Sequence, residues 1–548
     1  MLGAGQAARP SSGTKAQVQQ WFEQSRWQEV VDTVQDLPVH DADLDYFYGS
    51  ALAQLGRWPE SRSALLDGRR LRPRDKRFPI ELAGVAFKQK RYADAAAWLR
   101  RGLHLDPADS YANDFLGTVY FIEGNLEAAL KYWNRIGKPQ IAAVTREQPL
   151  GVRPALLDRR LAFAAGEQLE LRNLLTSRAR IENLGIFVAP DVRLAARDGG
   201  DFDAVLNLAE RDGFGSNRWA ALASVFSGAG YQTVYPQYFN FRQSAINFSS
   251  LLRWDDQKRR AALDITGPLL GNRKRSYRIG CDLRNENWAI RRSFTGVAPV
   301  LATLNLRRAV AVAEIRSVES GSWQWSTGVE ISDRDYRSVS FGTALTPQQL
   351  MPGPQLKALA STDYTLWRIP EHRLVVETSM SAQLARVWSQ TPGVYSQLEG
   401  QLAARWLPKI AGDDFRTEVR VQGGGALGSV PFDELHMLGM ERDNDLWLRA
   451  HIGTRDGIKG SAPLGTEYFL SNVEVDKNLY SNGLITVKLS PFLDTGTISG
   501  VSAELATRKW LWDAGLEFKV RVLGVGMSFV WGRDLRMGNN ALYFASGR

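Results

Sequence analysis

The sequence has a single cysteine, Cys281, in 548 residues. One thiol excludes an intramolecular disulfide framework and any metal site built from several cysteines. Histidine is scarce as well, and its five occurrences are too scattered to give an HExxH motif or another paired-ligand spacing. The sequence therefore predicts no metal site. The histidines are His40, His104, His372, His436 and His451.

Long apolar runs are also missing. No stretch of 18 or more mostly apolar residues occurs, and the longest charge-free run, residues 219–241, contains Pro236 and several polar residues. A membrane-spanning helix is thereby excluded, which leaves a soluble protein or a β-barrel. No charged and apolar leader is visible at the start. We expect residues 1–14 to be disordered or the remnant of a processing site, because GAGQAA at 3–8 resembles the end of one.

Sequence motifs typical of cofactor binding and catalysis are either incomplete or in the wrong structural context. Gly423, Gly425 and Gly428 match the pattern GxGxxG. A dinucleotide site requires a helix after this pattern, and Pro431 and the strand-rich surroundings argue against one. GTRDGIKG at 453–460 lacks the spacing of a phosphate-binding loop, and no GxSxG occurs. We therefore expect no enzyme activity and no cofactor. The net charge of +9 is spread evenly, so nucleic acid is not an expected partner.

An internal repeat occupies the first part of the chain. Pro73 and Pro107 lie 34 residues apart, and other positions repeat in the same phase. Such a period predicts a stack of helical pairs, in which small residues allow adjacent helices to approach closely. The small residues that follow this period are Gly49, Gly56, Ser61, Ala95, Gly117, Gly124 and Ala129.

The expected helices are 46–55, 59–71, 80–90, 92–105, 111–123 and 126–136, after a degenerate pair within 16–37. The segments LAGVAFKQKRYADAAAWLRRGLHLDP (82–107) and LGTVYFIEGNLEAALKYW (116–133) resemble the tetratricopeptide repeat (TPR) family. The resemblance implies a concave face for a peptide or protein partner. A rigid spacer is the alternative.

Residues 138–212 have another pattern. We expect helices over 156–163 and 169–183, and strands over 186–188, 192–196 and 204–209, with a turn at 197–203. Residues 174–211 resemble the second half of a POTRA domain, which implies a sheet edge that can accept a client strand. A generic α+β connector is the alternative. The matching residues are Leu184, Gly185, Phe187 and Glu210.

From about Pro236 onward, apolar and polar residues alternate with period two, as in 277–283, 374–384 and 512–522. A soluble sandwich with a dry interior fits, and so does an outer-membrane barrel whose apolar face points outward. Several runs reach the about 9–11 residues that cross a bilayer, which favours a barrel of about 16 strands. Nine tryptophans near strand ends suit an interfacial girdle: Trp254, Trp288, Trp323, Trp367, Trp388, Trp406, Trp447, Trp510 and Trp531. Cys281 lies on an apolar strand face, where we expect it to pack.

Residues 424–475, PFLDTG at 491–496 and MSFVWGRDLRMG at 527–538 resemble the C-terminal barrel of the Omp85 superfamily. This superfamily includes the BamA/TamA-like assembly proteins and the two-partner secretion transporters, and its barrel is also called the bacterial surface antigen or D15 domain. The matching residues are Pro431, Leu438, Gly439, Leu448, Arg449, Gly465, Tyr468, Phe469 and Glu474, followed by Phe492, Asp494 and Gly496.

In that family the loop that carries the arginine folds back into the lumen, where the arginine pairs with an acidic group on the wall. The resemblance therefore implies a gating pair of Arg449 with Asp494; an ordinary surface arginine is the alternative. Two residues depart from the family pattern: Ala450 replaces a glycine and His451 replaces an aromatic residue.

We thus expect a multidomain chain: TPR-like helices over 15–137, a POTRA-like α+β module over 138–212, a linker over 213–236 and an antiparallel transmembrane barrel over 237–548. The resemblance implies a bacterial outer-membrane protein that inserts or translocates client proteins. Its periplasmic half would capture an unfolded or peptide-like client or a periplasmic partner, and outer-membrane lipid would surround the barrel. Three alternatives stay open: a membrane-anchored scaffold, lipid-linked transport, and a soluble TPR–β fusion that acts as a binding module.

Overall fold

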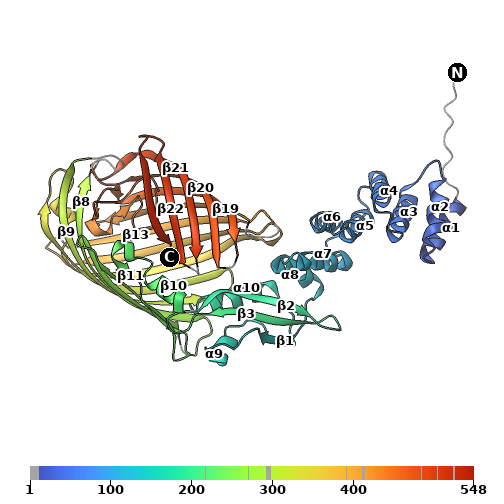
Figure 1. Cartoon of the computed structure of the whole chain (residues 1–548), viewed down its shortest axis with the longest axis horizontal. Coiled ribbons are helices and arrows are strands. Elements are labelled where there is room, and N and C mark those ends of the chain that lie inside the picture. Colours follow the sequence, from blue (N-terminus) through green and yellow to red (C-terminus); the bar gives the residue numbers. More distant parts are fainter. Residues whose placement is uncertain are drawn as a thin grey trace, which may run out of the picture. The chain divides into compact units, whose positions relative to one another are not determined.

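The computed structural model (Figure 1) describes residues 12–215, 218–269, 271–291, 298–390, 392–409, 414–482, 484–502, 504–522 and 525–547. The chain forms two compact units. The first comprises residues up to 142 with the short segments 166–171 and 197–202, and the second comprises the rest. The expectation for residues 1–11 lies outside the described residues. Among the described helices, none combines the length and the apolar character needed to cross a membrane.

The first unit is a series of helical pairs, which confirms the TPR-like expectation. Gly56, Lys90 and Gly124 lie one period apart in the turns within successive pairs, and all three have a positive φ of 76°, 59° and 71°. The repeat is therefore visible in the backbone as well as in the sequence. The helices are α1 (Ser12–Glu23), α2 (Trp27–Gln35), α3 (Ala42–Gln54), α4 (Trp58–Leu71), α5 (Arg77–Lys88), α6 (Tyr92–Leu105), α7 (Ser110–Ile122) and α8 (Leu126–Trp133).

Small residues lie where the paired helices touch. Ser61, Ala95 and Ala129 are fully buried, and the Ser61 hydroxyl donates to the carbonyl of Gly49 at 2.7 Å. A Cβ on Gly49 would lie 2.6 Å from Leu65 Cγ, and one on Gly117 would lie 2.3 Å from Trp133 Cδ1. Larger side chains at these two glycines would therefore separate the helices.

A small α+β module follows. Its sheet has the order β1-β3-β2, from strands β1 (Ile141–Arg146), β2 (Phe187–Ala196) and β3 (Phe202–Glu210), with helices α9 (Pro154–Asp158) and α10 (Leu171–Glu182). The structure differs from the sequence-based prediction in three places. Strand β1 was not predicted, the two short runs expected over 186–196 form one strand, and α9 ends before the expected boundary. The expected linker 213–236 contains α11 (Arg218–Val225), η2 (Ala229–Tyr231) and β4 (Thr233–Val234).

The rest of the chain is a large antiparallel β-sheet in barrel order. The strands of its wall are β5 (Gln237–Phe241), β6 (Ile246–Trp254), β7 (Lys258–Pro268), β8 (Arg275–Arg291), β9 (Val300–Val318), β10 (Trp323–Ser340), β11 (Gly353–Ile369), β12 (Leu374–Val387), β13 (Gly393–Trp406), β14 (Phe415–Gly428), β19 (Glu467–Ser481), β20 (Ile485–Ser499), β21 (Thr507–Val522), β22 (Val525–Asp534) and β23 (Asn540–Gly547).

Eighteen described segments follow one another in this order, of which β16 (Thr454–Arg455) and β17 (Ile458–Lys459) form a small hairpin inside a loop. The sixteen others include β4 and β5, which both pair with β6. The expectation of about 16 strands is thus close to the structure. Figure 1 shows the long strands curving into one continuous wall.

The wall is apolar outside and polar inside. On β13, Val394 and Leu398 are 56% and 58% exposed, whereas the alternate residues Tyr395 and Gln397 are buried. On β10, Ile331 is exposed while Arg334 is almost fully buried. Buried charge and exposed apolar side chains reverse the pattern of a soluble core, as in a barrel whose outer face contacts lipid.

Three residues of the sequence-based prediction lie elsewhere than expected. Trp288 is buried in the barrel interior, where its ring packs against Phe432 at 5.1 Å between centroids, so it is not a girdle residue. Trp447 lies in a loop rather than at a strand end. Cys281 is exposed on the outer face of β8 rather than packed in a core.

Candidate functional site

The loop of residues 429–466, which joins β14 to β19, is the candidate functional site; we call it the lumen loop. It contains η5 (Phe432–Glu434), β15 (His436–Met437), the β16–β17 hairpin and β18 (Leu464–Gly465). β15 pairs with β18, and Lys459 of β17 pairs with Trp288 on the wall strand β8. Since Trp288 faces the interior, the loop folds back inside the barrel.

Arg449 attaches the middle of the lumen loop to strands β19–β21. Its Nε and Nη2 donate to the two carboxylate oxygens of Asp494 at 2.9 and 2.8 Å. Its Nη1 contacts Glu474 and lies 3.3 Å from Glu517. The guanidinium also lies over the ring of Phe492, 3.7 Å from the centroid. The structure therefore brings together four residues that the sequence singled out: Arg449, Asp494, Glu474 and Phe492.

The other predicted loop residues surround this contact. Leu448 is fully buried in a cluster with Leu438, Tyr468 and Leu470. The N–H of Ala450 donates to Asp513 at 2.7 Å, and Ala450 is not among the described residues with a positive φ. The loop therefore reaches the wall with an ordinary backbone where the related family has glycine.

Two predicted glycines lie where the loop touches the wall. A Cβ on Gly496 would lie 3.2 Å from Leu438 of the loop. A Cβ on Gly465, which pairs with His436, would lie 2.3 Å from the carbonyl oxygen of Ser499. Both positions need the smallest side chain because backbone and loop approach there closely.

A second contact, which the sequence did not predict, holds the start of the loop on strands β9–β11. Glu434 lies 2.8 Å from Arg308, 3.3 Å from Arg334 and 3.0 Å from Lys357. Asp433 lies 3.2 Å from Arg308 and 3.3 Å from Arg334. Cations from three adjacent strands thus converge on two consecutive acidic residues.

A third contact holds the loop on strands β6 and β7. Asp443 pairs with Arg253 at 2.9 Å and with Arg260 at 2.6 Å. Burial alone would raise the pKa of Asp443, but Lys459, Arg253 and Arg260 hold that pKa well below its usual range. The carboxylate therefore stays ionised although it is buried. Glu441 lies beside it, 3.4 Å from Lys258.

The interior is divided by charge. We call the first group of wall residues the basic wall, because its members bind acidic residues of the loop: Arg253, Lys258, Arg260, Arg308, Arg334 and Lys357. We call the second group the acidic wall, because its members face Arg449 and His451: Glu474, Asp494, Asp513, Glu517 and Asp534. Acidic residues of the loop thus face the basic wall, and Arg449 and His451 face the acidic wall. Lys459 of the loop in addition pairs with Glu286 of β8 at 2.8 Å.

The α+β module touches the turns at the opposite end of the barrel from the one at which the lumen loop enters. Asn183 Nδ2 donates to Ser276 at the start of β8, and the Thr176 hydroxyl accepts from the N–H of Gly321 in the β9–β10 turn. The side chain of Asn247 donates to the carbonyl of Leu184 at 2.9 Å. The expected motif residue Gly185 follows directly, and its positive φ of 71° positions this carbonyl.

Glu210, the acidic residue expected at the end of the hairpin, forms a further contact between the module and the barrel. Its carboxylate accepts from the N–H groups of Gly151 and Val152 at 2.6 and 2.9 Å and from Asn240 at 2.8 Å. Asn240 belongs to β5, so this one side chain joins the module to the first part of the barrel.

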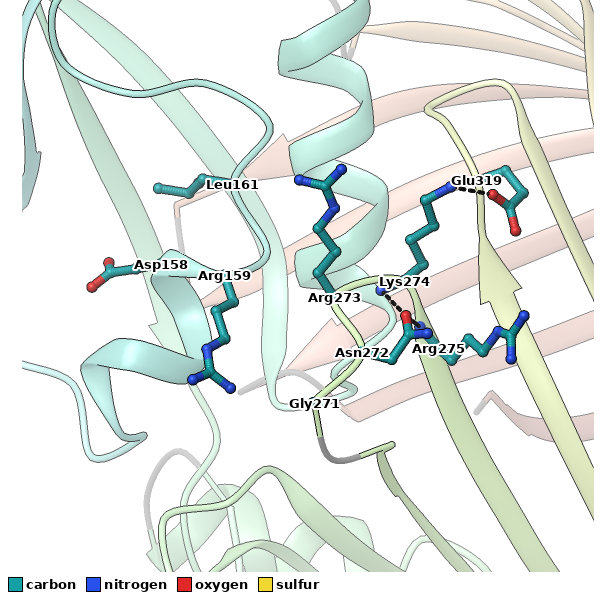
Figure 2. Close-up of a pocket in the computed structure, with 9 residues that line it drawn as sticks. All are labelled: Asp158, Arg159, Leu161, Gly271, Asn272, Arg273, Lys274, Arg275 and Glu319. Atoms are coloured by element: carbon teal, nitrogen blue, oxygen red, sulfur yellow. Dashed lines mark hydrogen bonds and ion pairs between the residues drawn. The ribbon is translucent and has the colours of Figure 1, made fainter.

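A basic pocket of about 770 Å³ lies between α9 of the module and the β7–β8 turn (Figure 2). Arg159, Arg273, Lys274 and Arg275 supply its cations, and Lys274 pairs with Glu319 at 2.5 Å. In Figure 2 the three arginine side chains extend in different directions. The pocket therefore offers dispersed positive charge rather than one converging site.

Among the described residues, Tyr231 links the first and last parts of the barrel wall. It lies just before β4, and its ring stacks on Phe544 of β23 with 6.5 Å between centroids and an interplanar angle of 12°. The hydroxyl of Tyr231 contacts the Phe544 carbonyl. We call the boundary between β23 and β4 the seam.

Comparison with known proteins finds a sequence family at the start of the chain and solved structures of low sequence identity over more of it. A family model described as a tetratricopeptide repeat matches residues 48–112. No curated protein matches the sequence. Among solved structures, BamA from Haemophilus ducreyi lacking POTRA domains 1-3 is 11% identical, over 74% of this chain and 83% of that chain, with a TM-score of 0.42.

CdiB from Escherichia coli is 12% identical over 75% of each chain, with a TM-score of 0.46. CdiB from Acinetobacter baumannii is 12% identical over 74% of this chain and 73% of that one, with a TM-score of 0.43. The chain is thus similar in sequence to tetratricopeptide repeats over residues 48–112.

Proposed function

We propose that this chain is a bacterial outer-membrane protein that assists the insertion or translocation of client proteins. In this proposal the barrel sits in lipid, the α+β module and the helical repeats lie in the periplasm, and no covalent chemistry is involved. The observation that carries the proposal is the lumen loop, which folds into the interior and is held by Arg449, Asp433–Glu434 and Asp443.

The outer surface supports a membrane location. Val394 and Leu398, which point outward from β13, are more than half exposed, and burying such residues in hydrocarbon is favourable by roughly 25 cal/mol per Å². Trp254, Trp323 and Trp406 are exposed at strand ends, where interfacial aromatic residues are typical.

The interior supports a gated route rather than a permanently open one. With the lumen loop inside the barrel, a client has two routes. It can pass the loop when the loop is displaced, or it can pass through an opened seam. The ion pairs of Arg449 with Asp494, Glu434 with Arg308 and Asp443 with Arg253 are buried. Removing one partner of such a pair is costly because the other charge stays buried. Since the three contacts lie on different strands, the loop can also transmit a change at one wall to the others.

The units before the barrel support client capture. A helical repeat stack presents an extended surface to a protein partner, and the three-stranded sheet of the module has edges that can accept a further strand. The module contacts the start of β8 and the β9–β10 turn directly, so a client bound there would be delivered next to the barrel.

The test is insertion by the full chain in liposomes. The purified protein is reconstituted, a urea-denatured outer-membrane β-barrel protein is added as the probe, and insertion is followed by protease protection and heat-modifiable gel migration. We expect faster insertion than in liposomes without the protein, and a slower rate for Arg449→Ala.

Equal rates with and without the protein would overturn the transport proposal and favour the membrane-anchored scaffold. Acceleration that is unchanged by Arg449→Ala would leave transport in place and remove the gating role of Arg449.

A further inference from the structure

Three side chains that belong to different parts of the barrel converge beside Arg449. His451 comes from the lumen loop, Asp513 from β21 and Asp534 from β22. They are 1%, 0% and 0% exposed. One ligand-type atom of each, a ring nitrogen or a carboxylate oxygen, lies within 4.8 Å of the corresponding atoms of the other two.

The strand register explains why the two carboxylates meet. Asp513 and Asp534 are directly opposite each other in the β21–β22 ladder, and both point into the interior. Like charges at directly opposite positions repel each other. The two aspartates therefore require a nearby cation or shared protons. Without either, two like charges would be buried together at a large cost in free energy.

The loop backbone fixes the histidine at this place. The N–H of Ala450 donates to Asp513 Oδ2 at 2.7 Å, and His451 Nδ1 lies 3.0 Å from the same oxygen. A Cβ on Gly532 of β22 would lie 3.2 Å from the carbonyl oxygen of Arg449. Glycine at position 532 thus allows the loop to pass close enough for the imidazole to reach both strands.

Two carboxylate oxygens of this cluster have no hydrogen-bond partner among the described residues, although they are buried: Asp513 Oδ1 and Asp534 Oδ2. His451 Nε2 lies 3.8 Å from Asp534 Oδ2, which is too long for a hydrogen bond. The neighbouring Arg449 does not serve these oxygens, because its donors go to Asp494, Glu474 and Glu517.

A metal ion is suited to this combination of atoms. Two ligands that each lie about 2.0–2.2 Å from one ion can be up to about 4 Å apart, and the separation of 3.8 Å between His451 Nε2 and Asp534 Oδ2 falls within that span. One imidazole nitrogen with carboxylate oxygens suits a first-row divalent ion.

We infer that His451, Asp513 and Asp534 form a binding site for a divalent transition-metal ion of the Zn²⁺ type, which joins the lumen loop to strands β21 and β22. The ion neutralises the facing aspartates and uses the unpartnered oxygens. Binding does not depend on the transport function, because it can be measured in the absence of a client. Sequence spacing could not reveal the site, since His451 and Asp513 are 62 residues apart.

The test measures Zn²⁺ binding to the full chain, purified without a histidine tag and stripped with a chelator. Titration calorimetry and elemental analysis are applied to the wild type, to His451→Phe and to Asp534→Asn. His372→Gln, which alters an exposed histidine near the opposite end of the barrel, is the matched control for adventitious surface binding.

We expect one equivalent of Zn²⁺ in the wild type and in His372→Gln, and affinity at least about 100-fold weaker in the two site variants. Equal binding in the wild type and the site variants would overturn the inference. Tighter binding of Mg²⁺ or Ca²⁺ than of Zn²⁺ would overturn the assigned ion class. No binding of any of these ions would leave protonation of the cluster as the source of charge balance and would also overturn it.

A measurement on the wild type alone covers the case in which the variants do not fold. X-ray absorption at the zinc edge is expected to show a shell of nitrogen and oxygen with a single imidazole. A shell that contains sulfur or more than one imidazole would place the ion elsewhere on the chain and contradict the assignment.

Discussion

Arg449 and Asp494 form a two-pronged contact in the barrel interior, in which Nε and Nη2 donate to the two carboxylate oxygens at 2.9 and 2.8 Å. Bidentate geometry of this kind is specific to arginine. The same carboxylate also accepts from the N–H of Arg449 at 3.2 Å and from Asn472 at 2.8 Å. The contact therefore fixes the orientation of the loop as well as its position.

Arg449→Ala should destabilise the barrel by about 3–5 kcal/mol, because it leaves the buried Asp494 and Glu474 without their cation. Heat-modifiable gel migration at increasing temperature measures the loss. Arg449→Lys keeps the positive charge but cannot form the two-pronged hydrogen bond. This variant should therefore recover only part of the lost stability. In the double variant with Asp494→Asn the two losses should be clearly less than additive; full additivity would contradict a direct coupling.

Asp443→Asn should release the part of the lumen loop around it, because Arg253 and Arg260 then lose the carboxylate that they share. Hydrogen exchange of residues 438–462 should become faster. Asp445→Asn is the matched control, since Asp445 lies two positions away but is exposed. Equal exchange in the two variants would remove Asp443 from the set of loop contacts.

The pH dependence of this contact follows from the pKa of Asp443. A carboxyl group whose pKa is lowered in the folded state stabilises that state above its unfolded value of 3.8, and the effect is lost as the pH falls below it. Between about pH 8 and about pH 5, exchange of the loop, corrected for its intrinsic pH dependence, should therefore stay constant. A rise near about pH 6 would indicate that another group controls docking.

Gly532→Val should displace the loop tip, since even a Cβ at this position would lie 3.2 Å from the carbonyl oxygen of Arg449 and 3.3 Å from Ala450 Cα. Overpacking of this kind costs about 1–3 kcal/mol. Faster hydrogen exchange confined to residues 446–453 would report it. Gly400→Val is the control, because no atom of the described residues lies within 4 Å of its Cβ position.

The local features of this chain could be predicted from the sequence, and the contacts that close the interior could not. The 34-residue period located the helices because turns, caps and helix contacts depend on nearby residues. Alternation likewise indicated which side of each strand is apolar. The two-residue period also places Trp288 on the inner face, since Ile279, Cys281 and Leu283 are exposed on the outer face. The prediction that Trp288 belongs to an outer girdle did not take this alternation into account.

The loop contacts required information that one sequence does not contain. Arg449 and Asp494 were paired through their resemblance to a family. Glu434 and Arg308 are 126 residues apart, and their meeting depends on the register of several strands and on the path of the loop. The acidic pairs Asp433–Glu434 and Glu441–Asp443 were visible as charges, but nothing in the sequence indicated that they would be buried against β6–β11.

Leu398→Arg should impair membrane insertion of the barrel. Leu398 is near the middle of β13 and points outward, and a charged residue near the bilayer midplane costs about 2–4 kcal/mol. Folding into liposomes, followed by heat-modifiable migration, measures the effect. Gln401→Arg on the inner face of the same strand is the control. If both variants fold equally well, the outer face of β13 does not contact hydrocarbon.

Gly117→Ala should destabilise the helical repeats by about 1–3 kcal/mol, because the added methyl group would lie 2.3 Å from Trp133 Cδ1. Gly84→Ala in α5 adds the same methyl group where the described part of the chain has no atom within 4 Å, so it should stabilise its helix by about 0.5–1 kcal/mol. Thermal melting followed by circular dichroism at the helical band distinguishes the two. A shift of equal sign in both variants would show that helix propensity, rather than the contact between α7 and α8, decides the stability of this repeat.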